Sequence, residues 1–218
     1  MKRVLQPELL DELPASDPRA IHSRRDLRRI NATMGNARIL THFLAQHVGQ
    51  GPITMAELGA GDGNVGLQVA RNLGACGRIL LIDREPAIAE AKLDGWKVEV
   101  IRADVFEWLR AAPNVDIIVV NLFLHHFETE ALRRLLAESA RRCRYFAAAE
   151  PRRNRFAQSF AAMVGLIGCN EVTRQDAVVS VRAGFNNDEL ARLWPEGSWH
   201  IHERRAGPFT HLFAAAQK

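Results

Sequence analysis

The fold of this chain is decided by the stretch Ala56-Glu57-Leu58-Gly59-Ala60-Gly61-Asp62-Gly63. It follows the short apolar run 53–55 and precedes apolar positions between 65 and 69, so it joins a buried strand to a helix. Glycine tolerates dihedrals that other residues avoid and lets the backbone pass close to a ligand. The helix that follows presents free N–H groups to a negative group. The stretch therefore predicts a nucleotide-type cofactor site in the first half of the chain.

The glycine spacing alone does not choose between ligands. Gly61, Gly63 and Gly66 also fit the dinucleotide pattern G-x-G-x-x-G, which is a weak signal without its context. A tight strand-to-helix turn that binds nothing is a further interpretation. The residues at the ends of the next strands separate these possibilities.

Polar side chains end the next three predicted strands. Strand 78–83 ends at Asp83, about 20 residues past the glycines, where a carboxylate accepts hydrogen bonds from ribose hydroxyls. Strand 97–103 runs into Asp104 and Val105, where a carboxylate meets an adenine amino group and the next N–H meets a ring nitrogen. Strand 115–120 runs into Asn121. The glycine turn and Asp83 by themselves would serve either NAD or S-adenosylmethionine.

Taken together, these strand ends resemble those of the class I S-adenosylmethionine-dependent methyltransferases. The stretch from Glu57 to Gly61 resembles their first motif, Asp83 their ribose acid, and the stretch 103–105 their adenine contact. The resemblance covers residues 53–150 and implies S-adenosylmethionine as the cofactor. The cofactor-binding residues that it implies are Glu57, Gly59, Ala60, Gly61, Asp83, Arg84, Asp104, Val105 and Asn121.

The turn after the fourth strand suggests a substrate class. Its sequence, Asn121-Leu122-Phe123-Leu124-His125-His126-Phe127, is similar to small-molecule methyltransferases that act on phenols and quinones. Segments 26–31 and 172–182 look like a bacterial branch associated with aromatic polyketide and phenolic-lipid pathways. The resemblance implies methyl transfer to an oxygen, rather than a carbon, of a small hydroxylated aromatic compound.

His125 and His126 are the predicted catalytic residues. A phenol has a pKa of about 10 and benefits from a base at neutral pH, a task that suits histidine. Adjacent residues rarely point the same way, so we expect one imidazole in the pocket, and His126 is the predicted base. The alternative is that both only frame the site. No metal is predicted, because the pair lacks a third ligand at a recognisable spacing.

The alternation of strands and helices predicts an α/β fold with a doubly wound sheet. The resemblance implies the seven-stranded Rossmann-like methyltransferase sheet, in which the last strand is antiparallel. We expect residues 1–50 to form an N-terminal helical cap and residues 51–218 to form the S-adenosylmethionine-binding domain. The two parts are expected to make one structural unit. Within the cap, Arg25, Arg28 and Arg29 share one helix face, and we expect this helix to close over the pocket. A second basic cluster, 152–155, follows the fifth strand.

Composition restricts the partners. The chain has 218 residues, and 29 basic against 25 acidic residues give a net charge of only +4, which does not argue for nucleic acid. No apolar run reaches membrane-spanning length. Cys76, Cys143 and Cys169 show neither paired metal spacing nor a disulfide framework, which favours a reducing cytoplasm. The expected partner is a small aromatic substrate.

Two other functions remain open from the sequence. An NAD-dependent oxidoreductase would need its own catalytic group, and Tyr145, the one tyrosine, lacks the lysine four residues later that short-chain dehydrogenases carry. An inactive S-adenosylmethionine-binding scaffold would bind the cofactor without turnover and would be insensitive to changes at either histidine.

Overall fold

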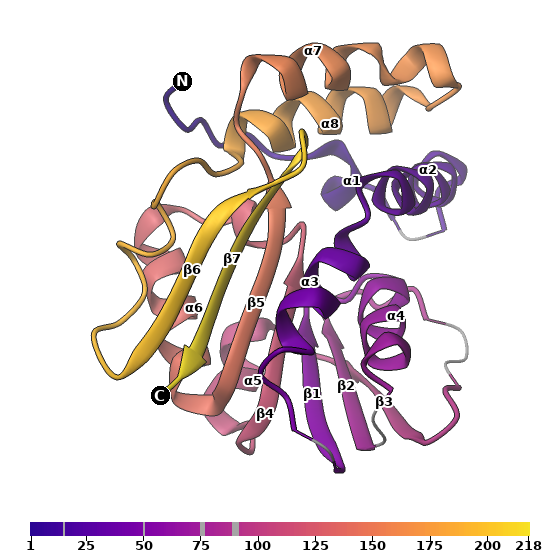
Figure 1. Cartoon of the computed structure of the whole chain (residues 1–218). Helices are drawn as coiled ribbons and strands as arrows, with labels where there is room; N and C mark the ends of the chain where they lie inside the picture. The colour runs from indigo at the N-terminus through magenta and orange to yellow at the C-terminus, as the bar shows by residue number, and fades with distance from the viewer. Residues whose placement is uncertain (15, 50, 75–76, 89–91) are drawn as a thin grey trace.

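Seven strands form one mixed sheet in the order β3-β2-β1-β4-β5-β7-β6 (Figure 1). The computed structural model describes all residues except 15, 50, 75–76 and 89–91. Cys76 therefore lies outside the described residues. The strands are β1 (Ile53–Leu58), β2 (Gly77–Asp83), β3 (Trp96–Arg102), β4 (Val115–Asn121), β5 (Cys143–Pro151), β6 (Trp199–Ala206) and β7 (Thr210–Gln217). Strands β1 to β5 pair in parallel, and β7 runs antiparallel to both β5 and β6.

Helices precede, connect and follow these strands. They are α1 (Leu9–Glu12), α2 (Pro18–Met34), α3 (Asn36–Leu44), α4 (Asn64–Leu73), α5 (Val105–Ala111), α6 (Thr129–Arg142), α7 (Arg155–Met163) and α8 (Glu171–Ala183), with the 3-10 turns η1 (Leu124–His126) and η2 (Val164–Ile167). Helix α2 begins as the sequence indicates, because the Asp17 side chain accepts from the Arg19 N–H and Pro18 occupies the first turn. It ends at Gly35, whose φ of 68° is left-handed.

Both faces of the sheet are buried, which confirms the doubly wound prediction. Along β2, Leu80 and Ile82 join the core on one face, while Ile79 and Leu81 join the core on the other. Helices α5 and α6 contribute to the first core, and α3 and α4 to the second. Each fully buried side chain of this size contributes about 1.5–3 kcal/mol. The two cores therefore fix the strand ends that carry the site.

The helical layer beyond the carboxyl ends of the parallel strands draws on both ends of the chain (Figure 1). Helices α1 and α2 contact α8, whereas α3 contacts α4, β5 and β7. The segment before α1 also crosses to α8, since the Val4 N–H donates to the Arg182 carbonyl at 3.1 Å. Among the described residues, no helix is long and apolar enough to span a membrane.

Candidate active site

The glycine loop between β1 and α4 is tightly enclosed on one side and open on the other. Gly59, Gly61 and Gly63 all have positive φ, between 55° and 70°. A Cβ at Gly59 would lie 2.4 Å from the ring of Phe123, so only glycine fits there. A Cβ at Gly61 would meet no atom within 4 Å. The Cβ position of Gly61 therefore faces open space, whereas that of Gly59 faces Phe123.

Asp83 lies at this open side. Its Oδ2 accepts from the Gly61 N–H at 2.8 Å, and its Oδ1 accepts from the Glu85 N–H at 2.8 Å. The carboxylate thus braces the glycine loop and lies where a ribose acid is expected. The neighbouring Arg84 is exposed, and its carbonyl accepts from the Arg102 side chain at 3.1 Å.

Asp104 occupies the N-cap of α5. Its Oδ1 accepts from the Phe106 N–H at 2.9 Å, which is the capping geometry that stabilises a helix start. Val105 is buried in the core behind it. The structure thus gives Asp104 a structural role at the strand end where an adenine contact is expected.

Glu57 is a buried carboxyl group directly below the glycine loop. Its Oε1 accepts from the Gly66 N–H at 3.1 Å, whereas its buried Oε2 has no hydrogen-bond partner within the described part of the chain. Burial raises the pKa of Glu57 to about 8. An orphaned carboxyl oxygen fits a cofactor with a cationic amino-acid end, as S-adenosylmethionine has. Ala60, also buried, donates its N–H to the Ile82 carbonyl at 3.0 Å and holds the loop against β2.

Asn121 connects β4 to the helical layer. Its Oδ1 accepts from Asn36 Nδ2 at 2.7 Å, and Asn36 Oδ1 accepts from the Thr210 hydroxyl at 2.8 Å. Asn36 is fully buried at the start of α3. This chain of polar side chains fixes the end of β4 from two other elements, and the sequence alone did not indicate it.

The turn after β4 is held by one buried carboxylate. Glu150 Oε1 accepts from the N–H groups of Phe123 and Leu124 at 3.0 and 2.8 Å, and its Oε2 lies 2.8 Å from His125 Nδ1. Leu122, at the start of the turn, has a φ of 50°, which is unusual for a residue with a branched side chain. Such strain persists only where the surroundings impose it, and Glu150 supplies that constraint.

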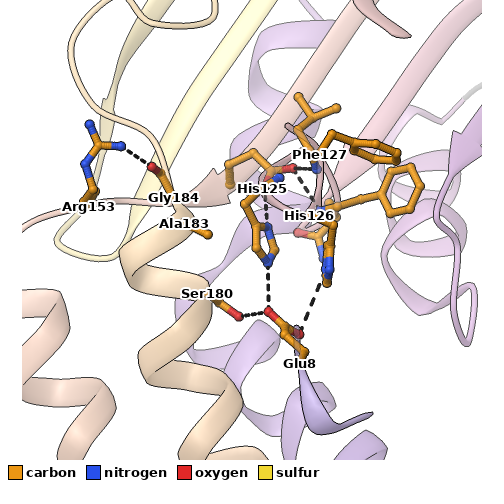
Figure 2. A network of polar contacts seen from close by, with 12 residues as sticks. Glu8, His125, His126, Phe127, Arg153, Ser180, Ala183 and Gly184 are labelled. Carbon is orange, nitrogen blue, oxygen red and sulfur yellow. Dashed lines mark hydrogen bonds and ion pairs between the residues drawn. The ribbon is translucent and has the colours of Figure 1, made fainter. Parts of the chain in front are cut away.

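His125 is buried, and its ring points toward Glu8 (Figure 2). Its Nδ1 faces Glu150, and its Nε2 lies 3.2 Å from Glu8 Oε1. Burial disfavours the charged imidazole, but the hydrogen bonds to Glu150 and Glu8 outweigh it and raise the pKa of His125 to about 9. Both ring nitrogens are therefore occupied, and His125 has no free lone pair with which to serve as a base.

His126 is the more accessible imidazole, with 26% of its side chain exposed. Its Nδ1 lies 3.3 Å from Asp11 Oδ2, and its Nε2 lies 4.0 Å from Glu8 Oε2. The Phe123 ring, which covers Gly59, lies 6.3 Å from the His126 ring, centroid to centroid. One imidazole is thus packed and the other partly open, while the catalytic roles of both remain a prediction.

Three residues outside the sequence motifs also lie near the candidate site or support it. Arg28, on the basic helix α2, lies 3.3 Å from Asp62 of the glycine loop, atom Nε to atom Oδ2. Arg153 is buried and serves the architecture, since it donates to the carbonyls of Met1 and Gly184. Glu8 was missed by sequence reasoning, because it lies 117 residues before His125 and carries no motif.

The part of the chain that contains the glycine loop matches a known protein family. Residues 55–145 match the family profile described as "Methyltransferase domain". The chain contains a methyltransferase domain. A comparison with curated proteins finds no match.

The methyltransferase domain also has structural relatives. The chain is similar to the plantazolicin methyltransferase BpumL in complex with a monoazolic desmethylPZN analogue and SAH, at 13% identity, TM-score 0.70, and coverage of 93% of this chain and 92% of that chain. It is also similar to BamL, another plantazolicin methyltransferase, in complex with a triazolic desmethylPZN analogue and SAH. The identity is 12% and the TM-score 0.70, with coverage of 96% of this chain and 93% of that chain. A third similar structure is magnesium protoporphyrin IX methyltransferase from Synechocystis PCC 6803 with bound SAH. The identity is 11% and the TM-score 0.50, with coverage of 98% of this chain and 89% of that chain. At these identities the likeness concerns the fold.

These findings confirm the predicted fold class, a seven-stranded Rossmann-like methyltransferase sheet. The domain match confirms the predicted enzyme class, an S-adenosylmethionine-dependent methyltransferase, and S-adenosylmethionine is the cofactor that this class uses. The division at residue 50, the individual site residues and the substrate branch stay predictions.

Proposed function

We propose that the enzyme transfers a methyl group from S-adenosylmethionine to an oxygen of a small hydroxylated aromatic compound. The observation that carries the proposal is the turn after β4, in which Phe123 covers Gly59 of the cofactor loop and His126 stands partly exposed beside it. An aromatic ring and a nitrogen side chain next to the methyl donor suit a flat substrate with a hydroxyl group. The resemblance of this turn to phenol and quinone methyltransferases supports the same substrate class.

The cofactor would be held by the residues at the strand ends. Glu57, whose Oε2 has no hydrogen-bond partner among the described residues, would receive the ammonium group, Gly59 to Gly61 would bind the amino-acid end, and Asp83 would receive the ribose. Asp104 and Val105 are proposed to contact the adenine ring. Asn121 is proposed to contact the cofactor on the side where the substrate binds. When bound, S-adenosylmethionine supplies an electrophilic methyl group for an in-line displacement.

The residues of this chain would then orient the substrate. Alignment of hydroxyl oxygen, methyl and sulfur supplies much of the reduction in barrier, on the order of several kcal/mol. We assign His126 to contact with the substrate hydroxyl and His125 to positioning of the turn, since its imidazole is fixed by Glu150 and Glu8. Arg28 on α2 would help to close the pocket and exclude water. A cytoplasmic enzyme of aromatic secondary metabolism fits these assignments.

Calorimetric titration with S-adenosylhomocysteine and with NADH tests the cofactor assignment. We expect S-adenosylhomocysteine alone to bind wild type, and Asp83→Ala to weaken that binding by at least about tenfold, because the variant loses both the ribose contact and the brace on Gly61. Asp188→Asn, which changes an exposed pair with Arg192, is the control and should bind as wild type does. Binding of NADH instead would support an oxidoreductase and refute the proposal.

A panel of phenols and hydroquinones with radiolabelled methyl donor then tests the reaction. We expect oxygen-methylated product, and a large loss of turnover in His126→Ala at unchanged S-adenosylhomocysteine affinity. A protein that binds the cofactor, methylates no hydroxylated aromatic and ignores this change would be the inactive scaffold.

A further inference from the structure

Three side chains that commonly bind metal ions converge on one point of the helical layer (Figure 2). Glu8 comes from the segment before α1, and His125 and His126 come from the turn after β4. One ligand atom from each lies within 4.8 Å of the others, and no second group with this property occurs within the part of the chain that the structure describes. The fold thus supplies the third ligand that the sequence spacing did not reveal.

The two imidazoles are oriented as metal ligands are. Both Nε2 atoms face the Glu8 carboxylate, at 3.2 Å for His125 and 4.0 Å for His126. Both Nδ1 atoms face another carboxylate, Glu150 at 2.8 Å and Asp11 at 3.3 Å. Carboxylates behind the second ring nitrogen fix the tautomer and the ring orientation of metal-binding histidines and raise their basicity.

The surroundings favour positive charge between these atoms. Glu150 is fully buried and Glu8 is largely so, with side chains 0% and 12% exposed. A divalent cation bound between the imidazoles and Glu8 would supply that positive charge.

The ligands are also held in place by contacts of their own. The N–H groups of Leu9 and Leu10 donate to the Asp176 carboxylate at 2.8 and 3.0 Å, which anchors the residues next to Glu8. The Ser180 hydroxyl donates to Glu8 itself. Preorganised ligands lose little freedom on binding, and this favours affinity.

We propose that Glu8, His125 and His126 form a binding site for a divalent transition-metal ion, specifically Zn²⁺. Two imidazole nitrogens and one carboxylate oxygen are a ligand set that zinc accepts, with a fourth position for water or another oxygen ligand. The open position lies toward His126, the most exposed of the three. The cation would fasten the segment before α1 to the turn after β4. This inference goes beyond the proposed methylation; with the ion bound, the His126 ring would be a metal ligand and not the group that contacts the substrate hydroxyl.

Metal titration of the full chain, after removal of bound metal with a chelator, tests the proposal. Zn²⁺ is titrated in competition with a chromophoric chelator, and Co²⁺ is added separately because its visible absorption reports the geometry and the nitrogen ligands. We expect one tight equivalent per chain. Glu8→Gln and His126→Gln should each weaken binding by at least about tenfold, in line with the loss of a metal-site residue.

His200→Gln is the control, because His200 is exposed on β6, far from the cluster in sequence. Circular dichroism checks that each variant is folded, and His126→Gln is the safer of the two because its side chain is partly exposed. The proposal is overturned if folded wild type takes up no stoichiometric Zn²⁺. It is equally overturned if binding survives unchanged in both cluster variants, which would place the metal elsewhere.

Discussion

Glu57 shows how one buried side chain couples cofactor binding to protons. With a pKa of about 8, its carboxyl group is mostly protonated at pH 7 in the free protein. Because this value lies above the ordinary 4.5, the group costs stability increasingly as pH rises from about 4.5 through 8. A cationic ammonium beside it would favour the carboxylate and reverse that shift.

Binding of S-adenosylhomocysteine at pH 7 is therefore expected to release close to one proton from Glu57. Titration calorimetry in buffers of different ionisation enthalpy measures this release. The number of protons released is the slope of the observed binding enthalpy against the buffer ionisation enthalpy. Glu57→Gln keeps the shape and removes the proton, so its slope should be near zero. An equal slope in wild type and variant would assign the proton to another group and Glu57 to a bracing role.

Gly59 offers a second test at the residue scale. Gly59→Ala should abolish measurable S-adenosylhomocysteine binding, because the new methyl group would lie 2.4 Å from the Phe123 ring and displace either the ring or the loop. Gly35→Ala is the matched control, since Gly35 has the same φ of 68° but open space around its Cβ position. It should cost about 1–2 kcal/mol of stability and leave binding intact. If Gly59→Ala and Gly35→Ala lost S-adenosylhomocysteine binding to a similar degree, backbone strain and not the contact with Phe123 would explain the loss.

Residues that act with their sequence neighbours were predictable, and those that act across the fold were not. The glycines, Asp83 and Asp104 stand at strand ends that periodicity locates, so their convergence follows from parallel strands. Glu8 meets His125 only because its segment folds back over α8, and no local pattern encodes that contact.

At the scale of elements, Glu150 on β5 fixes the turn after β4 through hydrogen bonds to three consecutive backbone N–H groups and one imidazole. Glu150→Gln should destabilise the protein by about 3 kcal/mol, since an amide cannot accept all of these bonds and the imidazole loses one of its two carboxylate partners. Urea unfolding measures the difference. Asp188→Asn, which weakens an exposed ion pair, should cost less than about 1 kcal/mol. A similarly small cost for Glu150→Gln would contradict the assigned role.

Element prediction succeeded where apolar spacing was clear. The sequence placed the second and fourth strands, 78–83 and 115–120, within one residue of β2 and β4, because buried parallel strands are nearly continuous apolar runs. It did not single out α8 as a helix. The inner face of α8 includes Thr173 and Asp176, both buried polar residues that contact the N-terminal region, and these interrupt the apolar pattern.

At the scale of the whole molecule, the first twelve residues hold the helical layer to the sheet. Arg3 donates to the carbonyls of Ala183, His125 and Phe127, and so joins the end of α8 to the turn after β4. Deletion of residues 1–12 should therefore raise amide hydrogen exchange in α8 and in residues 122–127, and leave β2 and β3 unchanged. Mass spectrometry of exchanged peptides measures this. A uniform rise across the chain would show that the segment supports global stability instead.

The contact of Glu8 with Ser180 spans 172 residues, and this separation sets an order of events during synthesis. At about 5–20 residues per second, a ribosome needs roughly 10–35 s to extend the chain from one to the other. During that interval the first segment lacks its partners on α8, while the strands from β1 to β4 are synthesised. The cofactor loop is thus made early, and the contact between Glu8 and Ser180 can form only after β1 to β5 have been synthesised. A nascent chain arrested before residue 170 should expose its N-terminal residues to proteases and chaperones.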